Sequence, residues 1–178
     1  MNKEKTIVIV VGHPGVGKTT FCNLFAQIHK FKNINTGKCI SEYLLMKKIK
    51  IGQKESWGEV FLQNFPPEYV YKVINKKIVD DSKFILDGLR LYSAYLKFKK
   101  EYQKVINVII DAKEDIRSKR LFERSTNEGF EHDEARNISI AKDKFQIELN
   151  KLEKKANIII DNSGSLDDLI RKIKSFPF

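Results

Sequence analysis

The feature that most constrains this chain lies near its start, where glycines, a lysine and a threonine follow a run of β-branched residues. Residues 12–19 read Gly-His-Pro-Gly-Val-Gly-Lys-Thr. Two glycines five apart, followed directly by Lys and Thr, are the spacing of a phosphate-binding loop between a strand and a helix. A buried strand is predicted before the loop at residues 6–11. A helix is predicted after it, with one apolar face made by Leu24, Phe25 and Ile28.

Each residue type in this loop suits the binding of phosphate. Glycine lets the backbone adopt positive φ angles and approach an anion closely. Successive N–H groups then form an anion cradle at the positive end of the next helix. Lys18 supplies a charge for the β- and γ-phosphates of a nucleotide, and the Thr19 hydroxyl is a ligand for Mg²⁺. The alternative is a glycine-rich turn that binds nothing. We expect the whole segment to bind ATP, through Gly12, His13, Pro14, Gly15, Val16, Gly17, Lys18, Thr19 and Thr20.

Length and composition favour one domain with its own hydrophobic core. The chain has 178 residues, of which 42% are apolar, and no apolar run of the length that a membrane span requires. We expect Cys22 and Cys39 to be reduced thiols of a cytoplasmic protein. The net charge of +10 permits a nucleic-acid partner. However, the lysines are spread over predicted helices and form no basic arm, and attraction of a small anionic substrate explains them as well.

Five apolar segments alternate with helical stretches along the chain. The segments are residues 6–11, 31–35, 83–87, 105–111 and 156–161. This alternation predicts a doubly wound α/β fold with a mostly or wholly parallel five-stranded sheet and helices on both faces. Helices are expected at residues 91–102, 113–123 and about 133–155, and a turn at residues 125–129. A capping pattern at Ser165 predicts a final helix through Lys174.

The stretch between the second and third strands is long for a simple crossover connection. It spans about residues 36–80 and is mostly helical, so we expect it to form an insert over the strand ends that binds the acceptor. Its aromatic residues, among them Trp57, Phe61 and Phe65, either line a base pocket or form the insert's own small core. For any single aromatic residue, the core is the favoured interpretation.

Polar residues follow the third strand at the sheet edge where this class of fold binds ligands. Asp87 ends an apolar run and precedes Gly88, so its carboxylate is expected at the carboxyl edge of the sheet. There it can hold Mg²⁺ through water, although Asp-Gly is also a common turn sequence. Arg90 lies three residues further on and can point at the same site.

Arginines on the helix after the fourth strand are candidates for binding phosphate oxygens. Arg117, Arg120 and Arg124 fall on one helix face, with Ile116 and Leu121 expected to face elsewhere. Ion pairs with nearby glutamates are the alternative, and that alternative is equally well supported for Arg117. About residues 117–136 are expected to form a short lid over the transferring phosphoryl group.

Together these segments resemble the P-loop nucleotide kinases, the group that holds adenylate kinase, thymidylate kinase and dephospho-coenzyme A kinase. The similarity covers most of the chain. Residues 12–20 are similar to the family's phosphate loop, and residues 35–37 to the Thr-Gly that ends its second strand. Residues 84–90 are similar to the Asp-Gly-x-Arg segment of archaeal adenylate-kinase-like proteins. Residues 120–124 resemble the lid helix, and residues 156–166 resemble the last strand and loop of dephospho-coenzyme A kinases.

The residues and the resemblance together imply ATP as donor, Mg²⁺ as metal and a small-molecule nucleotide as acceptor. The expected metal ligands are Thr19 and Asp87. The expected catalytic residues are Lys18, Asp87, Arg120 and Arg124. Further contacts with ATP are expected from Arg120, Asn162 and Gly164. Contacts with the acceptor are expected from Thr36, Gly37, Lys38, Arg90 and Arg136.

Two departures from the adenylate kinases bear on the acceptor. Those kinases usually carry Asp after the Thr-Gly and an Arg four residues after the Gly, where this chain has Lys38 and Ser41. This argues against AMP. A hydroxyl acceptor is helped by a carboxylate base, yet residues 33–40 hold no carboxylate. A phosphate acceptor needs no base, because positioning and charge neutralisation suffice.

We therefore predict an ATP-dependent kinase, monomeric or homodimeric, that phosphorylates a nucleoside or deoxynucleoside monophosphate. The first alternative is a hydroxyl kinase similar to dephospho-coenzyme A kinase. The second is a nucleotide-dependent ATPase or binding protein, whose activity would respond to RNA in a salt-sensitive way.

Overall fold

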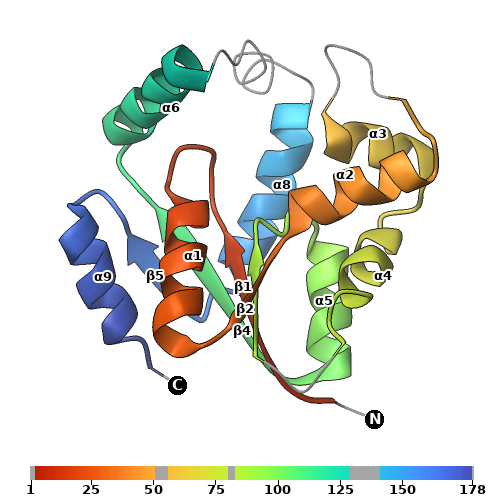
Figure 1. The fold of residues 1–178 in the computed structure, drawn as a ribbon, viewed down its shortest axis with the longest axis horizontal. Coiled ribbons are helices and arrows are strands. Elements are labelled where there is room, and N and C mark those ends of the chain that lie inside the picture. The colour runs from red at the N-terminus through yellow and green to blue at the C-terminus, as the bar shows by residue number, and fades with distance from the viewer. Residues whose placement is uncertain (1–2, 51–55, 80–82, 129–140, 178) are drawn as a thin grey trace.

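A computed structural model describes residues 3–50, 56–79, 83–128 and 141–177. Five strands form one sheet in the order β2-β3-β1-β4-β5, and every neighbouring pair is parallel (Figure 1). The predicted doubly wound α/β fold is confirmed. The strands are β1 (Lys3–Val11), β2 (Lys32–Asn35), β3 (Phe84–Asp87), β4 (Tyr102–Asp111) and β5 (Ile158–Asp161).

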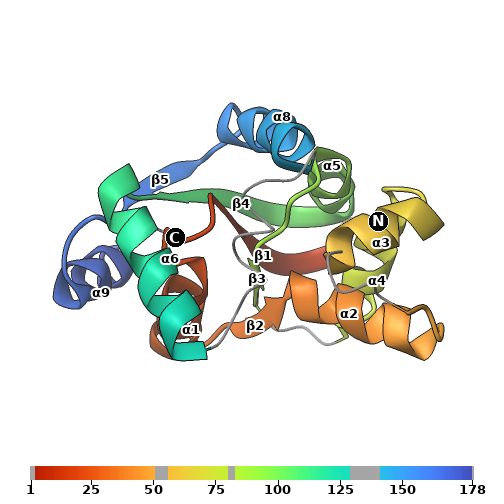
Figure 2. The same ribbon diagram turned by 90° about the horizontal axis from the view of Figure 1, so that it is seen from above.

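Helices cover both faces of this sheet. Seen from above, α1 and α9 lie on one face, and α5 and α8 lie on the other (Figure 2). The helices after the first three strands are α1 (Lys18–His29), α2 (Thr36–Met46), α3 (Trp57–Asn64), α4 (Tyr69–Asn75) and α5 (Tyr92–Glu101). The later ones are α6 (Glu114–Glu128), α8 (Ala141–Glu153) and α9 (Leu166–Lys174). Among the residues that the structure describes, no helix is long and apolar enough to cross a membrane.

The alternation of side chains along β1 divides the core into two layers. Ile7 and Ile9 point into a cluster that also contains Leu149 of α8. Val8 and Val10 point to the opposite face, where they meet Phe21 of α1. Because these central strands are buried on both faces, their sequence is continuously apolar rather than alternating. The sheet therefore lies between two apolar layers, and polar residues such as Asp87 lie at the carboxyl ends of its strands.

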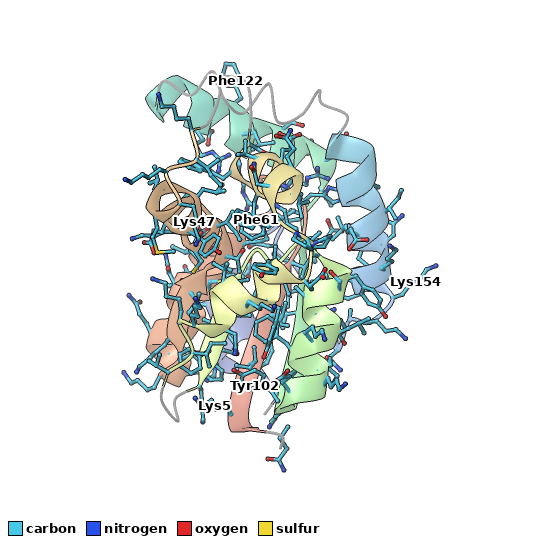
Figure 3. All side chains as sticks on the ribbon, turned by 90° about the vertical axis from the view of Figure 1, so that its right-hand side faces the viewer. Lys5, Lys47, Phe61, Tyr102, Phe122 and Lys154 are labelled. Atoms are coloured by element: carbon cyan, nitrogen blue, oxygen red, sulfur yellow. The ribbon has the colours of Figure 1, made fainter. Side chains whose placement is uncertain are left out.

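The helices α2, α3 and α4 form the predicted helical insert, and aromatic side chains fill its centre. The ring centroid of Phe65 lies 5.0 Å from that of Phe61 and 5.3 Å from that of Tyr43. Phe61 is fully buried and lies among these helices in the middle of Figure 3. Trp57 is partly buried against the same cluster. The described geometry therefore supports the interpretation of these aromatic residues as the insert's own core.

Several boundaries differ from the sequence predictions. Residues 125–128 continue α6 instead of forming a turn, because Ser, Thr and Asn lower helix propensity only modestly. Gly129, the last residue of the predicted turn, lies outside the described residues. Strand β4 begins at Tyr102, which is buried and pairs with Lys3 of β1. Helix α8 is described from Ala141, so the predicted start near residue 133 lies outside the described residues.

Candidate active site

The loop between β1 and α1 is enclosed by three other segments. A Cβ atom on Gly12 would lie 2.2 Å from the carbonyl oxygen of Ile110, at the end of β4. On Gly15 it would lie 2.8 Å from the Arg117 carbonyl oxygen in α6. On Gly17, whose φ angle is +88°, it would lie 2.4 Å from the Asn162 side-chain nitrogen. The backbone therefore sits where no side chain fits, as expected of a cradle that brings N–H groups close to an anion.

Lys18, the first residue of α1, folds back over this loop. Its Nζ donates a hydrogen bond of 2.7 Å to the carbonyl oxygen of His13. Burial and then the charge of Arg90 lower the pKa of Lys18 from 10.5 to about 8, against the opposing charge of Asp87. Arg124 also lowers this pKa. Three predicted site residues therefore influence the pKa of Lys18: Arg124 of α6, Asp87 of β3, and Arg90 in the segment after β3.

The two predicted metal ligands lie in direct contact. Thr19 Oγ1 donates a hydrogen bond of 2.9 Å to Oδ2 of Asp87, which is only 4% exposed at the end of β3. The parallel register of β1 with β3 places Asp87 beside Val10, just before the loop. A hydroxyl and a carboxylate oxygen are hard ligands of the kind that Mg²⁺ takes together with phosphates and water. Within the described residues, no three or more His, Cys, Asp or Glu side chains form a larger metal cluster. The pair therefore fits Mg²⁺ held partly by a bound nucleotide.

The start of α2 meets the same carboxylate from the other side. Asn35, the last residue of β2, donates from Nδ2 to Asp87 Oδ2 over 3.0 Å. Its Oδ1 accepts the Lys38 N–H over 2.9 Å and so caps α2. Thr36 Oγ1 lies 2.9 Å from the carbonyl oxygens of both Asp87 and Gly88. The predicted Thr36-Gly37 segment is therefore the first turn of α2 rather than the end of β2.

Asn35 is a site residue that the sequence interpretation missed. The signal was present, because Asn directly before a helical stretch is a favoured N-cap. Lys38 contributes its backbone N–H here, while its exposed side chain lies near Glu42 and Cys39 of its own helix. Arg90 is exposed and close enough to Lys18 to lower its pKa. Arg136 lies outside the described residues.

Helix α6 lies over the loop, as Figure 1 shows from the side. Arg117 Nε donates to the carbonyl oxygen of Pro14 over 3.4 Å. Arg120 Nη2 donates to the carbonyl oxygen of Asn162 over 3.0 Å. The side chain of Leu121 was expected to face elsewhere, which is wrong. A Cβ on Gly15 would lie 3.0 Å from its Cγ, because packing on the glycine turns this face of α6 toward the loop.

Asn162, directly after β5, contacts the phosphate loop. Asn162 is buried, and its Nδ2 donates to the carbonyl oxygen of Val16 over 2.8 Å. Its own N–H donates to the Asp111 carbonyl oxygen over 2.7 Å. Gly164 packs against the capping box of α9, where a Cβ would lie 2.6 Å from Asp168 Oδ2. Arg120 and Asn162, predicted to contact ATP, are thus brought together, and Gly164 packs against α9.

Comparisons with known proteins agree with this geometry. The sequence matches the family described as AAA domain over residues 11–139. It is 28% identical over 157 residues to UMP-CMP kinase 3 of Arabidopsis thaliana, covering 82% of this chain and 71% of the relative. It is also 28% identical over 187 residues to adenylate kinase 1 of Schistosoma mansoni, covering 94% and 90%.

Solved structures share the fold at low sequence identity. A shikimate kinase from Bacteroides thetaiotaomicron has a TM-score of 0.63 and 16% identity, with 95% of this chain and 96% of that chain covered. A gluconokinase from Sinorhizobium meliloti 1021 has a TM-score of 0.58 and 14% identity, with 98% and 92% covered. The family match spans the phosphate loop, the insert and α6, so this chain belongs to the AAA domain family and is a P-loop kinase.

Proposed function

We propose that this kinase transfers the γ-phosphoryl group of ATP to a nucleoside or deoxynucleoside monophosphate. The observation that supports this proposal most strongly is the pair of hydrogen bonds made by Asp87, the buried carboxylate at the sheet edge. Its Oδ2 accepts hydrogen bonds from Thr19 of the phosphate loop and from Asn35. The contact of this carboxylate with the loop threonine supports a role in metal binding rather than in deprotonating an acceptor.

The acceptor side supports the same reading. The last residue of β2, Asn35, carries an amide, and the first turn of α2 is Thr36-Gly37-Lys38, so neither supplies a carboxylate base. Glu42, on the same helix, pairs with Lys77 over 3.0 Å and is exposed. An ionised monophosphate needs positioning and charge neutralisation rather than a base. The two relatives named above are a UMP-CMP kinase and an adenylate kinase, both named for nucleotides.

In this proposal each residue has a distinct role. The loop amides and Lys18 hold the donor phosphates, while Thr19 and Asp87 hold Mg²⁺, which neutralises phosphate charge when bound. Arg120 and Arg124, both on α6, stabilise the charge of the transferring phosphoryl group. Arg90 and the first turn of α2 orient the acceptor. Electrostatic stabilisation of this kind is worth about 3–4 kcal/mol for each well-placed donor.

The test is an acceptor screen read by product mass. The purified chain is given ATP and Mg²⁺ with each nucleoside and deoxynucleoside monophosphate, and separately with dephospho-coenzyme A, shikimate and gluconate. We expect a new nucleoside diphosphate from one or a few monophosphates, and at least about 10²-fold slower turnover in Lys18→Ala. Phosphorylation of a hydroxyl compound, or ADP release without any phosphorylated acceptor, would overturn the proposal.

A further inference from the structure

Asn35 joins the two halves of the site through the two ends of one short side chain. It lies at the carboxyl end of β2, beside Asp87 in the parallel register of β2 with β3. Its Nδ2 contacts the Asp87 carboxylate over 3.0 Å, and its Oδ1 contacts the Lys38 N–H at the start of α2 over 2.9 Å. The residue is exposed, yet both of its polar groups are engaged.

The orientation of this amide follows from its partners. A backbone N–H can only donate, so the atom facing Lys38 must be the acceptor oxygen. A carboxylate accepts, so the atom facing Asp87 is the donor nitrogen. A carboxylate at position 35 would satisfy the first partner and oppose the second. An amide satisfies both.

We propose that Asn35 is a positioning residue that fixes the Asp87 carboxylate for Mg²⁺ and ties it to the acceptor helix α2. The proposal deepens the proposed function, on which its acceptor half rests. Asp87 Oδ2 has two donors, and one of them, the Thr19 hydroxyl, is itself an expected metal ligand. When Thr19 turns to the metal, Asn35 remains to hold the carboxylate in place.

Thr36, the residue after Asn35, adds a second link between β3 and α2. Thr36 Oγ1 reaches the carbonyl oxygens of Asp87 and Gly88, each over 2.9 Å, so β3 and the first turn of α2 are joined by side chains of two consecutive residues. An acceptor held by α2 would therefore keep a fixed position relative to the carboxylate that would hold the metal. Groups that orient a metal ligand in this way typically change metal affinity or activity by about 10–100-fold when removed.

The experiment separates the two ends of the side chain. Asn35→Ser keeps an oxygen that caps α2 and removes the amide Nδ2 that donates to Asp87, whereas Asn35→Ala removes both groups. Asn33→Ser is the matched control, because Asn33 lies on the same strand and its amide bonds to Asn23 of α1 over 2.8 Å instead. For each protein, calorimetry measures ADP affinity with and without Mg²⁺, and the melting temperature is recorded. Steady-state kinetics with the accepted monophosphate then gives kcat and the KM for the acceptor.

We expect the Mg²⁺-dependent gain in ADP affinity to fall about tenfold or more in both Asn35 variants. In Asn33→Ser it should stay as in the wild type. Affinity for ADP without Mg²⁺ should not change in any of them. Asn35→Ala should also melt at a lower temperature than Asn35→Ser, and it alone should raise the KM for the acceptor. In Asn35→Ser the loss should fall on kcat.

Three results would overturn the proposal. The first is an unchanged Mg²⁺ effect in Asn35→Ser. The second is an equal loss of ADP affinity with and without Mg²⁺, which would mean a general defect of the site. The third is lower melting temperatures in both Asn35 variants with an intact Mg²⁺ effect, which would reduce Asn35 to a helix cap. Because ADP binding needs no acceptor, failure of the proposed function would leave this test in force.

Discussion

Replacing Gly17 with alanine tests whether the phosphate loop is seated on the segment after β5. Gly17 has a φ angle of +88°, a conformation that costs an L-residue about 1–2 kcal/mol. The added Cβ would also lie 2.4 Å from Asn162 Nδ2, so the Asn162 side chain must turn away. Its hydrogen bond of 2.8 Å to the buried Val16 carbonyl would then be lost, at about 1–3 kcal/mol. Gly17→Ala should therefore lower the free energy of unfolding by about 2–5 kcal/mol.

A double-mutant cycle isolates the contact between the two residues. Asn162→Ala alone should cost about 1–3 kcal/mol, because it removes the same hydrogen bond. In the double variant that bond is lost only once and the clash is gone, so the combined effect should fall short of the sum by about 1–3 kcal/mol. Urea unfolding followed by circular dichroism gives each value by linear extrapolation.

Gly58 provides the control for this cycle. It lies in α3, and a Cβ placed there meets nothing within 4 Å. Gly58→Ala should be neutral or stabilise the protein by about 0.5–1 kcal/mol. Additivity of Gly17→Ala and Asn162→Ala within about 0.5 kcal/mol would mean, against this expectation, that the two residues do not interact.

Three further outcomes follow from individual contacts. The pKa of Lys18 is lowered from 10.5 to about 8, so between these pH values the unfolded state binds more protons. The free energy of unfolding should therefore contain a contribution that rises with pH across that window, and denaturant unfolding at several pH values should show it missing in Lys18→Met. Ser165→Ala breaks the capping box of α9 and should lower the free energy of unfolding by about 1 kcal/mol, measured by urea unfolding. Glu148 accepts a hydrogen bond of 2.7 Å from the Tyr92 N–H at the start of α5, a helix whose N-cap residue makes no side-chain hydrogen bond. Glu148→Ala should therefore lower the free energy of unfolding by about 1–2 kcal/mol in the same assay. No change in stability would show that this contact is not formed.

The sequence was sufficient to predict the phosphate loop and the position of Asp87 for a simple physical reason. Both follow from strand ends, and the carboxyl ends of parallel strands meet at one edge of the sheet. The contact of Thr19 with Asp87, although 68 residues apart, is a consequence of that rule. The capping box at Ser165 is local and was equally predictable.

Contacts that depend on the order of strands could not be predicted in this way. Asn35 meets Asp87 because β2 is the neighbour of β3, and the neighbour of β1 on that side is β3 rather than β2. The orientation of Leu121 depends on how α6 rotates when it packs on Gly15, and helical periodicity alone does not set that rotation. The bond from Arg120 to the Asn162 carbonyl likewise joins segments that only the folded sheet brings together.

In the proposed function, one site holds a donor nucleotide on the phosphate loop and an acceptor monophosphate at α2. A bisubstrate compound, in which adenosine is joined through a polyphosphate chain to the preferred acceptor nucleoside, tests it most directly. We expect this compound to compete with both ATP and the acceptor and to bind at least about 10²-fold tighter than ADP, because both halves engage at once. Competition with ATP alone, at an affinity no better than that of ADP, would contradict it.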